Sequence, residues 1–229
     1  MAKDKSYEYA KFAKIHPDLG RYTNLGFQAY VTLPSSKSLP QGGSYINAYC
    51  GMAGFECGIS VKYRSDFMDS RTGTYQWHWF ANGPEGQIDG PMCEYRDGEK
   101  VHIKLVRLEE NDHVQFKVDG DEKFTSKHAY GENTFKTDDT CARFIIGSEI
   151  TRYPTLPSSL PPWNLSFSRL QISDMRYKKA SGVWKDVNSD NATARLSHTP
   201  VELYPPSPVN FNGVDDDLEN GRFAVSMSV

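Results

Sequence analysis

The sequence lacks long apolar runs, and no segment approaches the roughly 18 consecutive residues that a membrane-spanning helix needs. Only 38% of its 229 residues are hydrophobic, which is a low fraction for a thick helical core. Basic residues are not in excess either, because 26 Lys and Arg are offset by 29 Asp and Glu, giving a net charge of -3. This balance excludes a strongly basic protein whose affinity comes from neutralising many phosphates. The sequence therefore predicts no membrane span and no nucleic-acid partner.

Cysteine is scarce as well, with single residues at positions 50, 57, 93 and 141. Four cysteines are too few for a disulfide scaffold, and the favoured interpretation is small buried thiols in strands. A single disulfide stays open for a secreted protein. None of the cysteines forms a Cys-x-x-Cys pair, and no His lies at a zinc-like spacing from them. We therefore predict no metal site, and since no Gly-rich phosphate loop is present, no cofactor.

Large aromatic side chains are plentiful by contrast, with 13 Tyr, 12 Phe and 4 Trp. A small number of apolar side chains, most of them large, is typical of thin β layers. From Phe27 to Leu33 apolar and polar residues alternate, which is the period of a half-buried strand. In residues 98–125, two alternating segments are joined by the polar sequence EEND, which predicts a hairpin.

Strand-like segments follow one another with almost no helical pattern between them. Parallel sheets need crossover helices, so we expect antiparallel sheets packed as a sandwich. Between Trp163 and Ile172 the apolar residues change from odd to even positions, which predicts a bulge near Ser168 and Arg169.

We divide the chain into three parts. Residues 1–20 form an N-terminal arm whose apolar spacing is compatible with a short helix, residues 21–200 the β-sandwich, and residues 201–229 a Pro- and Asp-rich extension. The charged start lacks the apolar stretch of a signal peptide. We therefore expect a cytoplasmic protein, or a secreted one whose signal was removed or whose export route this sequence does not carry. The sequence specifies no oligomeric state.

Several segments resemble known proteins. The hairpin that ends in Val-Asp-Gly at 118–120 resembles the concanavalin A-like jelly rolls. Within that superfamily, CGMAGF (50–55), YQWHWF (75–80) and ARFII (142–146) are similar in order and rough spacing to strands of the glutamic peptidases, or eqolisins. The resemblance implies an all-β fold, a two-sheet antiparallel jelly roll with irregular terminal extensions.

The catalytic pair of the glutamic peptidases is nevertheless missing. That family uses a Gln–Glu pair, in which the carboxylate activates water and the amide stabilises the oxyanion. Here Met52 and Arg143 stand at those positions. A thioether cannot donate to an oxyanion, and a guanidinium is always protonated and cannot act as a base. We therefore expect the scaffold without this chemistry, and we assign no catalytic residue.

Strand alternation and the resemblance together suggest a ligand site on one sheet face. If Ile59 and Phe144 are in the core, Glu56 and Arg143 lie together on the opposite face, which such sandwiches use as a concave groove. The aromatic strip 75–80 has rings at both alternating sets of positions, so one set is core and the other lines the groove. The predicted ligand-binding residues are Met52, Glu56, Trp77, His78, Trp79 and Arg143.

Three classes of function stay open at this point. The favoured one is a non-catalytic, lectin-like module that recognises a glycan or an extended peptide in the groove. The second is a hydrolase or lyase of the same fold with an acid/base pair that the sequence does not reveal. The third is a secreted effector or toxin-associated interaction protein.

Overall fold

The computed structural model describes residues 7–17, 24–39, 44–62, 68–69, 74–91, 94–135, 142–153, 165–199 and 211–228. In these ranges the regular secondary structure is β-strand, apart from short 3-10 helices at Glu132–Phe135 and Leu218–Asn220. No helix in the described ranges has the length and apolar character to cross a membrane.

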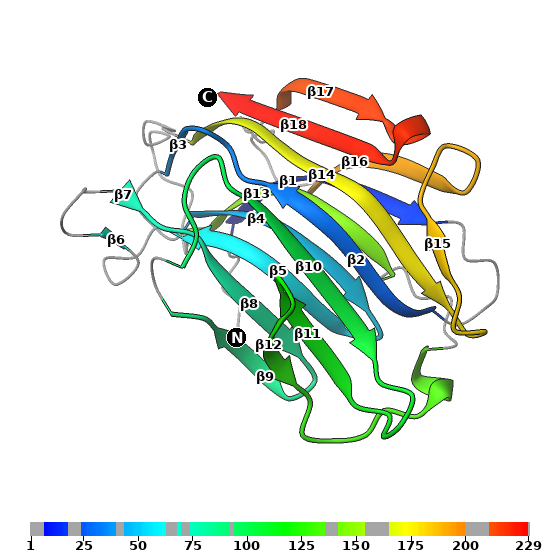
Figure 1. Cartoon of the computed structure of the whole chain (residues 1–229). Helices are drawn as coiled ribbons and strands as arrows, with labels where there is room; N and C mark the ends of the chain where they lie inside the picture. The colour runs from blue at the N-terminus through cyan, green and yellow to red at the C-terminus, as the bar shows by residue number, and fades with distance from the viewer. Residues whose placement is uncertain are drawn as a thin grey trace, which may run out of the picture.

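Two large antiparallel sheets pack face to face (Figure 1). Sheet A contains, in spatial order, β16 (Ala192–Thr199), β1 (Tyr7–Pro17), β13 (Arg143–Tyr153), β4 (Ser44–Met52), β5 (Phe55–Lys62), β8 (His78–Gly83) and β9 (Gly86–Asp89). Sheet B contains β12 (Asp121–Thr125), β11 (Val114–Val118), β10 (Lys100–Arg107), β2 (Asn24–Thr32), β14 (Ser166–Lys179), β18 (Arg222–Ser228) and β17 (Phe211–Asp217), and β3 (Lys37–Ser38) and β15 (Trp184–Asp186) pair with β14. The short strands β6 (Met68–Asp69) and β7 (Thr74–Tyr75) pair with each other. The predicted two-sheet antiparallel jelly roll is therefore confirmed.

The inner faces of the two sheets share one large hydrophobic core. Phe27 of sheet B meets Phe144 of sheet A edge to face, with ring centroids 5.3 Å apart. Alternate residues along each strand enter this core, as expected for strands with one face committed to the interior. Fully buried examples are Ala29, Val31, Ile46, Ala48, Ile59, Val61, Ile103, Leu105, Phe116 and Ile146.

The aromatic strip places its tryptophans inside the sandwich. Trp77 is 0% exposed and Trp79 is 8% exposed, whereas Phe80 belongs to a separate small cluster on the outer side of sheet A. Trp77 Nε1 donates a hydrogen bond to Asp97 Oδ1 at 2.7 Å, which satisfies the buried indole. Gly90 has no side chain that would obstruct Trp79, since a Cβ there would lie 2.3 Å from the indole nitrogen.

The N-terminal segment is a strand and not the helix that its spacing allowed. Residues 7–17 form β1, which pairs with β13 on one side and β16 on the other. Ala13 and Ile15 are buried in the main core, while Phe12 packs in the outer cluster. Apolar residues on both faces hid the strand period, and the resulting spacing imitated a helix.

The C-terminal segment also differs from the extension that was expected. Strands β17 and β18 belong to sheet B, and alternate residues Phe223, Val225 and Met227 of β18 enter the main core. Residues 201–210 lie outside the described part. The predicted bulge in β14 is confirmed, because its register with β18 shifts between Phe167 and Leu170.

Cys50 and Cys57 are opposite one another on β4 and β5, both buried and both free thiols. Burial raises the pKa of Cys50 to about 12 and raises that of Cys57 well above its ordinary value. This confirms the interpretation of buried strand thiols for this pair. Cys93 and Cys141 lie outside the described residues.

Close approach of β4 and β5 predicts a severe effect of Gly58→Ala. A Cβ at Gly58 would lie 2.2 Å from the carbonyl oxygen of Ala48 and 2.4 Å from Cβ of Tyr49, so neighbouring backbone must move. We expect the free energy of unfolding in urea to fall by about 3 kcal/mol. The control is Gly131→Ala, where a Cβ meets no atom within 4 Å, and it should change stability by less than about 1 kcal/mol. Equal effects of the two substitutions would contradict this packing.

Candidate functional site

A row of hydrogen-bonding side chains crosses the outer face of sheet A. Arg143 of β13 and Glu56 of β5 are both register partners of Gly51, which lies between them on β4. Glu56 is in turn opposite Asn82 of β8, and Asn82 is opposite Gln87 of β9. We call Arg143, Glu56, Asn82 and Gln87 the polar row. Arg143 and Glu56 each lie between two core residues, and Asn82 directly follows the core residue Ala81, so these three side chains point outward. Gln87 is opposite Asn82 and therefore lies on the same face.

Arg143 and Glu56 form an ion pair across Gly51, as the alternation of the strands predicted. Nη2 of Arg143 lies 3.7 Å from Oε1 of Glu56. The side chains are 15% and 32% exposed, so both are partly sheltered and still reach the surface. Since Gly51 carries no side chain, the space between the two charged groups is not filled from β4.

Beside the polar row lies a small cluster of buried apolar side chains. Phe12, Tyr49, Phe80 and Ile145 form a hydrophobic group on the outer face that is separate from the main core. The Tyr49 and Phe80 rings meet edge to face at 5.7 Å above Gly58, where a larger residue would collide with Tyr49. These rings support the outer face and leave the polar row as its more accessible part.

A second charged group, centred on Asp89, stiffens the same face. Lys62 Nζ lies 2.9 and 3.0 Å from the two carboxylate oxygens of Asp89, and Gln87 Nε2 donates to Oδ1 at 3.1 Å. Buried His78 lies with Nε2 3.7 Å from the same carboxylate. Burial alone would raise the pKa of Asp89, but His78 and Lys62 outweigh it and hold that pKa well below its usual range. Asp89 is therefore a fixed carboxylate that orients Gln87.

The six residues expected at the site separate into two groups. Glu56 and Arg143 lie together in the polar row, and His78 faces outward next to Asp89 but is fully buried. Met52, Trp77 and Trp79 point into the inter-sheet core and are 1%, 0% and 8% exposed. These three face away from the polar row.

Sequence reasoning missed Asn82 and Gln87. The Asn-Gly-Pro sequence at 82–84 has the composition of a turn, and a turn signal hides the face on which its first residue lies. Knowledge that Trp79 and Ala81 are core would have placed Asn82 on the outer face by parity. Within the described ranges, no group of three or more His, Cys, Asp or Glu side chains is arranged to hold a metal ion.

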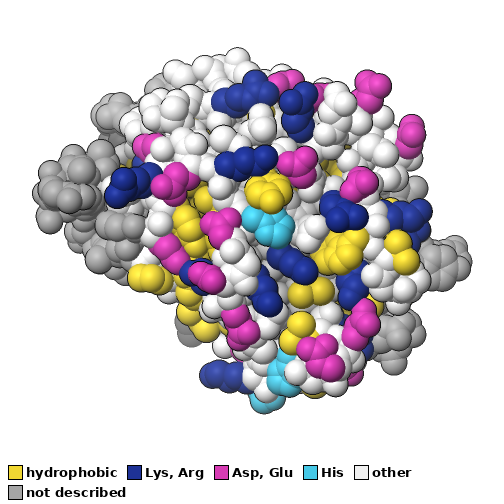
Figure 2. Space-filling view, viewed as in Figure 1, with side chains coloured by type: hydrophobic (Ala, Val, Ile, Leu, Met, Phe, Trp, Pro, Cys, Tyr) yellow, Lys and Arg dark blue, Asp and Glu magenta, His cyan; other side chains and the backbone are white. Residues whose placement is uncertain are grey.

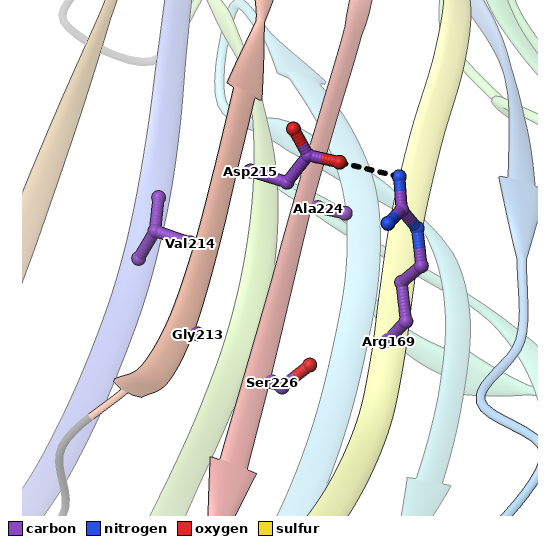
Figure 3. A pocket seen from close by; sticks show the side chains of 6 residues that line it. All are labelled: Arg169, Gly213, Val214, Asp215, Ala224 and Ser226. Carbon is purple, nitrogen blue, oxygen red and sulfur yellow. Dashed lines mark hydrogen bonds and ion pairs between the residues drawn. The ribbon is translucent and has the colours of Figure 1, made fainter.

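The outer face of sheet B carries a shallow hollow of about 190 Å³ near its edge (Figure 3). Its floor consists of the small residues Gly213, Ala224 and Ser226 of β17 and β18. Arg169 Nη2 and Asp215 Oδ2 lie 2.5 Å apart across it, as the dashed line in Figure 3 marks. The two charges therefore offset one another within the hollow.

Comparison with known proteins yields only distant likenesses. No protein-family model matches the chain, and no curated protein matches it. Similar solved structures include sheep galectin-11 in complex with glycerol, with 9% identity, coverage of 65% of this chain and 92% of that one, and a TM-score of 0.29. Toad ovary galectin in complex with thio-digalactose is 9% identical, covers 61% of this chain and 92% of its own, and has a TM-score of 0.29. A heptameric SAP-like pentraxin from Limulus polyphemus is 13% identical, covers 75% of this chain and 71% of its own, and has a TM-score of 0.29. The sandwich is established by the strand order alone, and the kinship with glutamic peptidases stays a prediction.

The charged group around Asp89 predicts a pH-dependent effect of Asp89→Asn. Losing the carboxylate leaves Lys62 without its partner, so the free energy of unfolding at pH 7 should fall by about 1–3 kcal/mol. Because the pKa of Asp89 is lowered by folding, its ionised form stabilises the fold above about pH 4, and this stabilisation is lost as the pH falls further.

Urea denaturation at pH 7 and pH 3 tests this expectation. The difference between wild type and Asp89→Asn should be large at pH 7 and smaller at pH 3. The control is Asp190→Asn in an exposed turn, which should change stability little at either pH. A difference that is the same at both pH values would show that the charge of Asp89 does not stabilise the fold.

Proposed function

We propose that this chain is a non-catalytic binding module that recognises a glycan on the outer face of sheet A. The observation that supports the proposal is the polar row, in which Arg143, Glu56, Asn82 and Gln87 follow one another across five adjacent strands with Gly51 between the first two. From β13 to β9 the row spans about 19 Å at the usual strand spacing. An elongated ligand lying across the strands fits this arrangement.

The chemistry of the row suits hydroxyl groups. A guanidinium only donates hydrogen bonds, a carboxylate only accepts them, and a primary amide does both. Sugar hydroxyls donate and accept, so a chain of them is complementary to such a mixed series. The charges of Arg143 and Glu56 offset each other at 3.7 Å, which favours a neutral polar ligand over an ion.

The position of the row favours a glycan over an extended peptide. Peptides in extended conformation bind chiefly by adding a strand to an open sheet edge, where backbone groups are free. Arg143, Glu56 and Asn82 belong to strands that are paired on both sides within sheet A. Their backbone groups are used in the sheet, so this surface offers side chains only.

The charges of this face support recognition rather than turnover. Acid–base catalysis needs a titratable pair within hydrogen-bond reach of the substrate. Glu56 has the permanently charged Arg143 beside it, and Asp89 is held ionised by Lys62 and His78. A carboxylate held ionised in this way does not donate a proton near neutral pH, so Asp89 does not act as a general acid there.

A glycan array probed with purified wild-type protein and with Arg143→Gln and Glu56→Gln tests the proposal. Each substitution removes charged hydrogen bonds to the ligand and should weaken binding of the strongest glycan about tenfold. The matched controls are Arg96→Gln and Glu219→Gln, which change the same residue types at exposed positions outside the polar row and should leave binding unchanged.

The same variants are tested on a peptide library in parallel. No glycan binding above background overturns the proposal, and so does glycan binding that both polar-row substitutions leave unaltered. Binding to peptides alone would replace the glycan by a peptide as the ligand of this face. Circular dichroism of each variant ensures that a loss of binding is compared between folded proteins.

A further inference from the structure

The outer face of sheet B carries a second and larger hollow, of about 340 Å³. Its lining includes four basic side chains and two acidic ones, from β10, β11, β14 and the loop between β10 and β11. Figure 2, viewed from the side of sheet B, shows Lys and Arg side chains gathered around hydrophobic patches in the middle of this face. We call the part lined by Lys104, Lys117 and Lys178 the basic hollow.

Two lysines of the basic hollow oppose one another directly. Lys104 of β10 and Lys117 of β11 are register partners, and both point outward because Ile103, Leu105 and Phe116 point into the core. Like charges directly opposite on one face of a sheet destabilise it. In the described part of the chain, neither ammonium has a carboxylate within ion-pair distance, although Glu122 of β12 is the register partner of Lys117 on its other side. Lys178 Nζ, by contrast, contacts Glu109 Oε1 at 2.5 Å.

The surroundings of Lys104 combine an attractive aromatic contact with unfavourable burial and like charges. Its ammonium lies 5.4 Å from the centre of the Trp184 ring, and the side chain is half-buried. Trp184 can lie against the sheet because residue 26 is glycine, where a Cβ would come within 3.1 Å of the indole. Burial and the charges of Lys117 and Lys178 lower the pKa of Lys104. The fold therefore holds concentrated positive charge beside an aromatic ring.

We propose that the basic hollow binds a tetrahedral oxyanion, the sulfate or phosphate group of a small molecule, with Trp184 packed against the part of the molecule that carries it. Ammonium groups of Lys104 and Lys117 donate charge-assisted hydrogen bonds to the oxyanion, which removes their mutual repulsion. The indole face offers an apolar surface to an attached ring. This site is on the opposite sheet from the polar row, so anion binding here can be tested separately from glycan binding there.

NMR titration of the ¹⁵N-labelled full chain tests the site with four probes: inorganic phosphate, inorganic sulfate, phenyl phosphate and phenyl sulfate. We expect saturable shifts at the amides of Lys104 and Lys117 and at the Trp184 indole N–H. Lys104→Gln and Lys117→Gln should each weaken binding about tenfold. Trp184→Leu should weaken the phenyl esters more than the inorganic ions.

The control Lys100→Gln removes a lysine from the same strand and face, but one whose ammonium lies 3.4 Å from the carboxylate of Asp174. It should leave the dissociation constants unchanged. Comparison of phosphate with sulfate, each alone and as its phenyl ester, shows which source of the oxyanion is preferred.

The thermal unfolding temperature, measured with and without anion, tests the site independently of the NMR titration. Without anion, Lys117→Gln should raise Tm because it removes the like-charge repulsion, and phosphate should then raise Tm of wild type more than that of the variant. The proposal is overturned if no probe gives saturable shifts, if sodium chloride gives the same shifts, or if Lys100→Gln weakens binding as much as Lys117→Gln. It is also overturned if Lys117→Gln lowers Tm and leaves binding intact.

Discussion

The contact between the inner faces of the two sheets determines where every other side chain of the sandwich can lie. Trp77, Trp79 and Phe144 occupy this interface together with the smaller residues of both sheets, and Gly90 makes room for one of the rings. Since successive residues of a strand point to opposite sides, each core position assigns its neighbours to the surface. The polar row follows from this constraint, because Asn82 must point outward once Ala81 points inward.

The two outer faces differ in how their charges are arranged. On sheet A, Arg143 is beside Glu56 and Lys62 is beside Asp89, so charges of opposite sign lie close together. On sheet B, Lys104 is opposite Lys117 in the basic hollow, and no described carboxylate lies within ion-pair distance of either ammonium, although Glu122 is the other register partner of Lys117. The first arrangement is complementary to neutral polar groups and the second to an anion. A single fold thus presents two chemically different surfaces on its two sides.

Strands could be predicted from the sequence where polar residues occupy one face and apolar residues the other. Residues 27–33 and 114–118 alternate cleanly, and their strands and core positions were predicted correctly. In β1 the outward Phe12 disrupted the alternation, and in the strip 75–80 rings on both faces left the core side undecided. The acidic edge strand β17 has the composition of a loop, which concealed its pairing with β18.

Only part of the candidate site could be predicted, because alternation assigns a residue to a face but does not identify its neighbours on other strands. Glu56 and Arg143 could be placed on one face by parity, since each is next to a core residue in a strong strand pattern. Register between strands distant in sequence is set by packing, so the neighbours Asn82 and Gln87 could not be identified in advance. The opposition of Lys104 and Lys117 likewise depends on hairpin register, which the sequence of the loop does not specify uniquely.

A crystal structure of the protein with the oligosaccharide that binds most strongly on the array would test glycan recognition by the polar row most directly. We expect a ligand lying across β13, β4, β5, β8 and β9, with hydroxyl groups within hydrogen-bond distance of Arg143, Glu56, Asn82 and Gln87. A ligand bound to sheet B or at an end of the sandwich, without contact to Arg143 or Glu56, would contradict it.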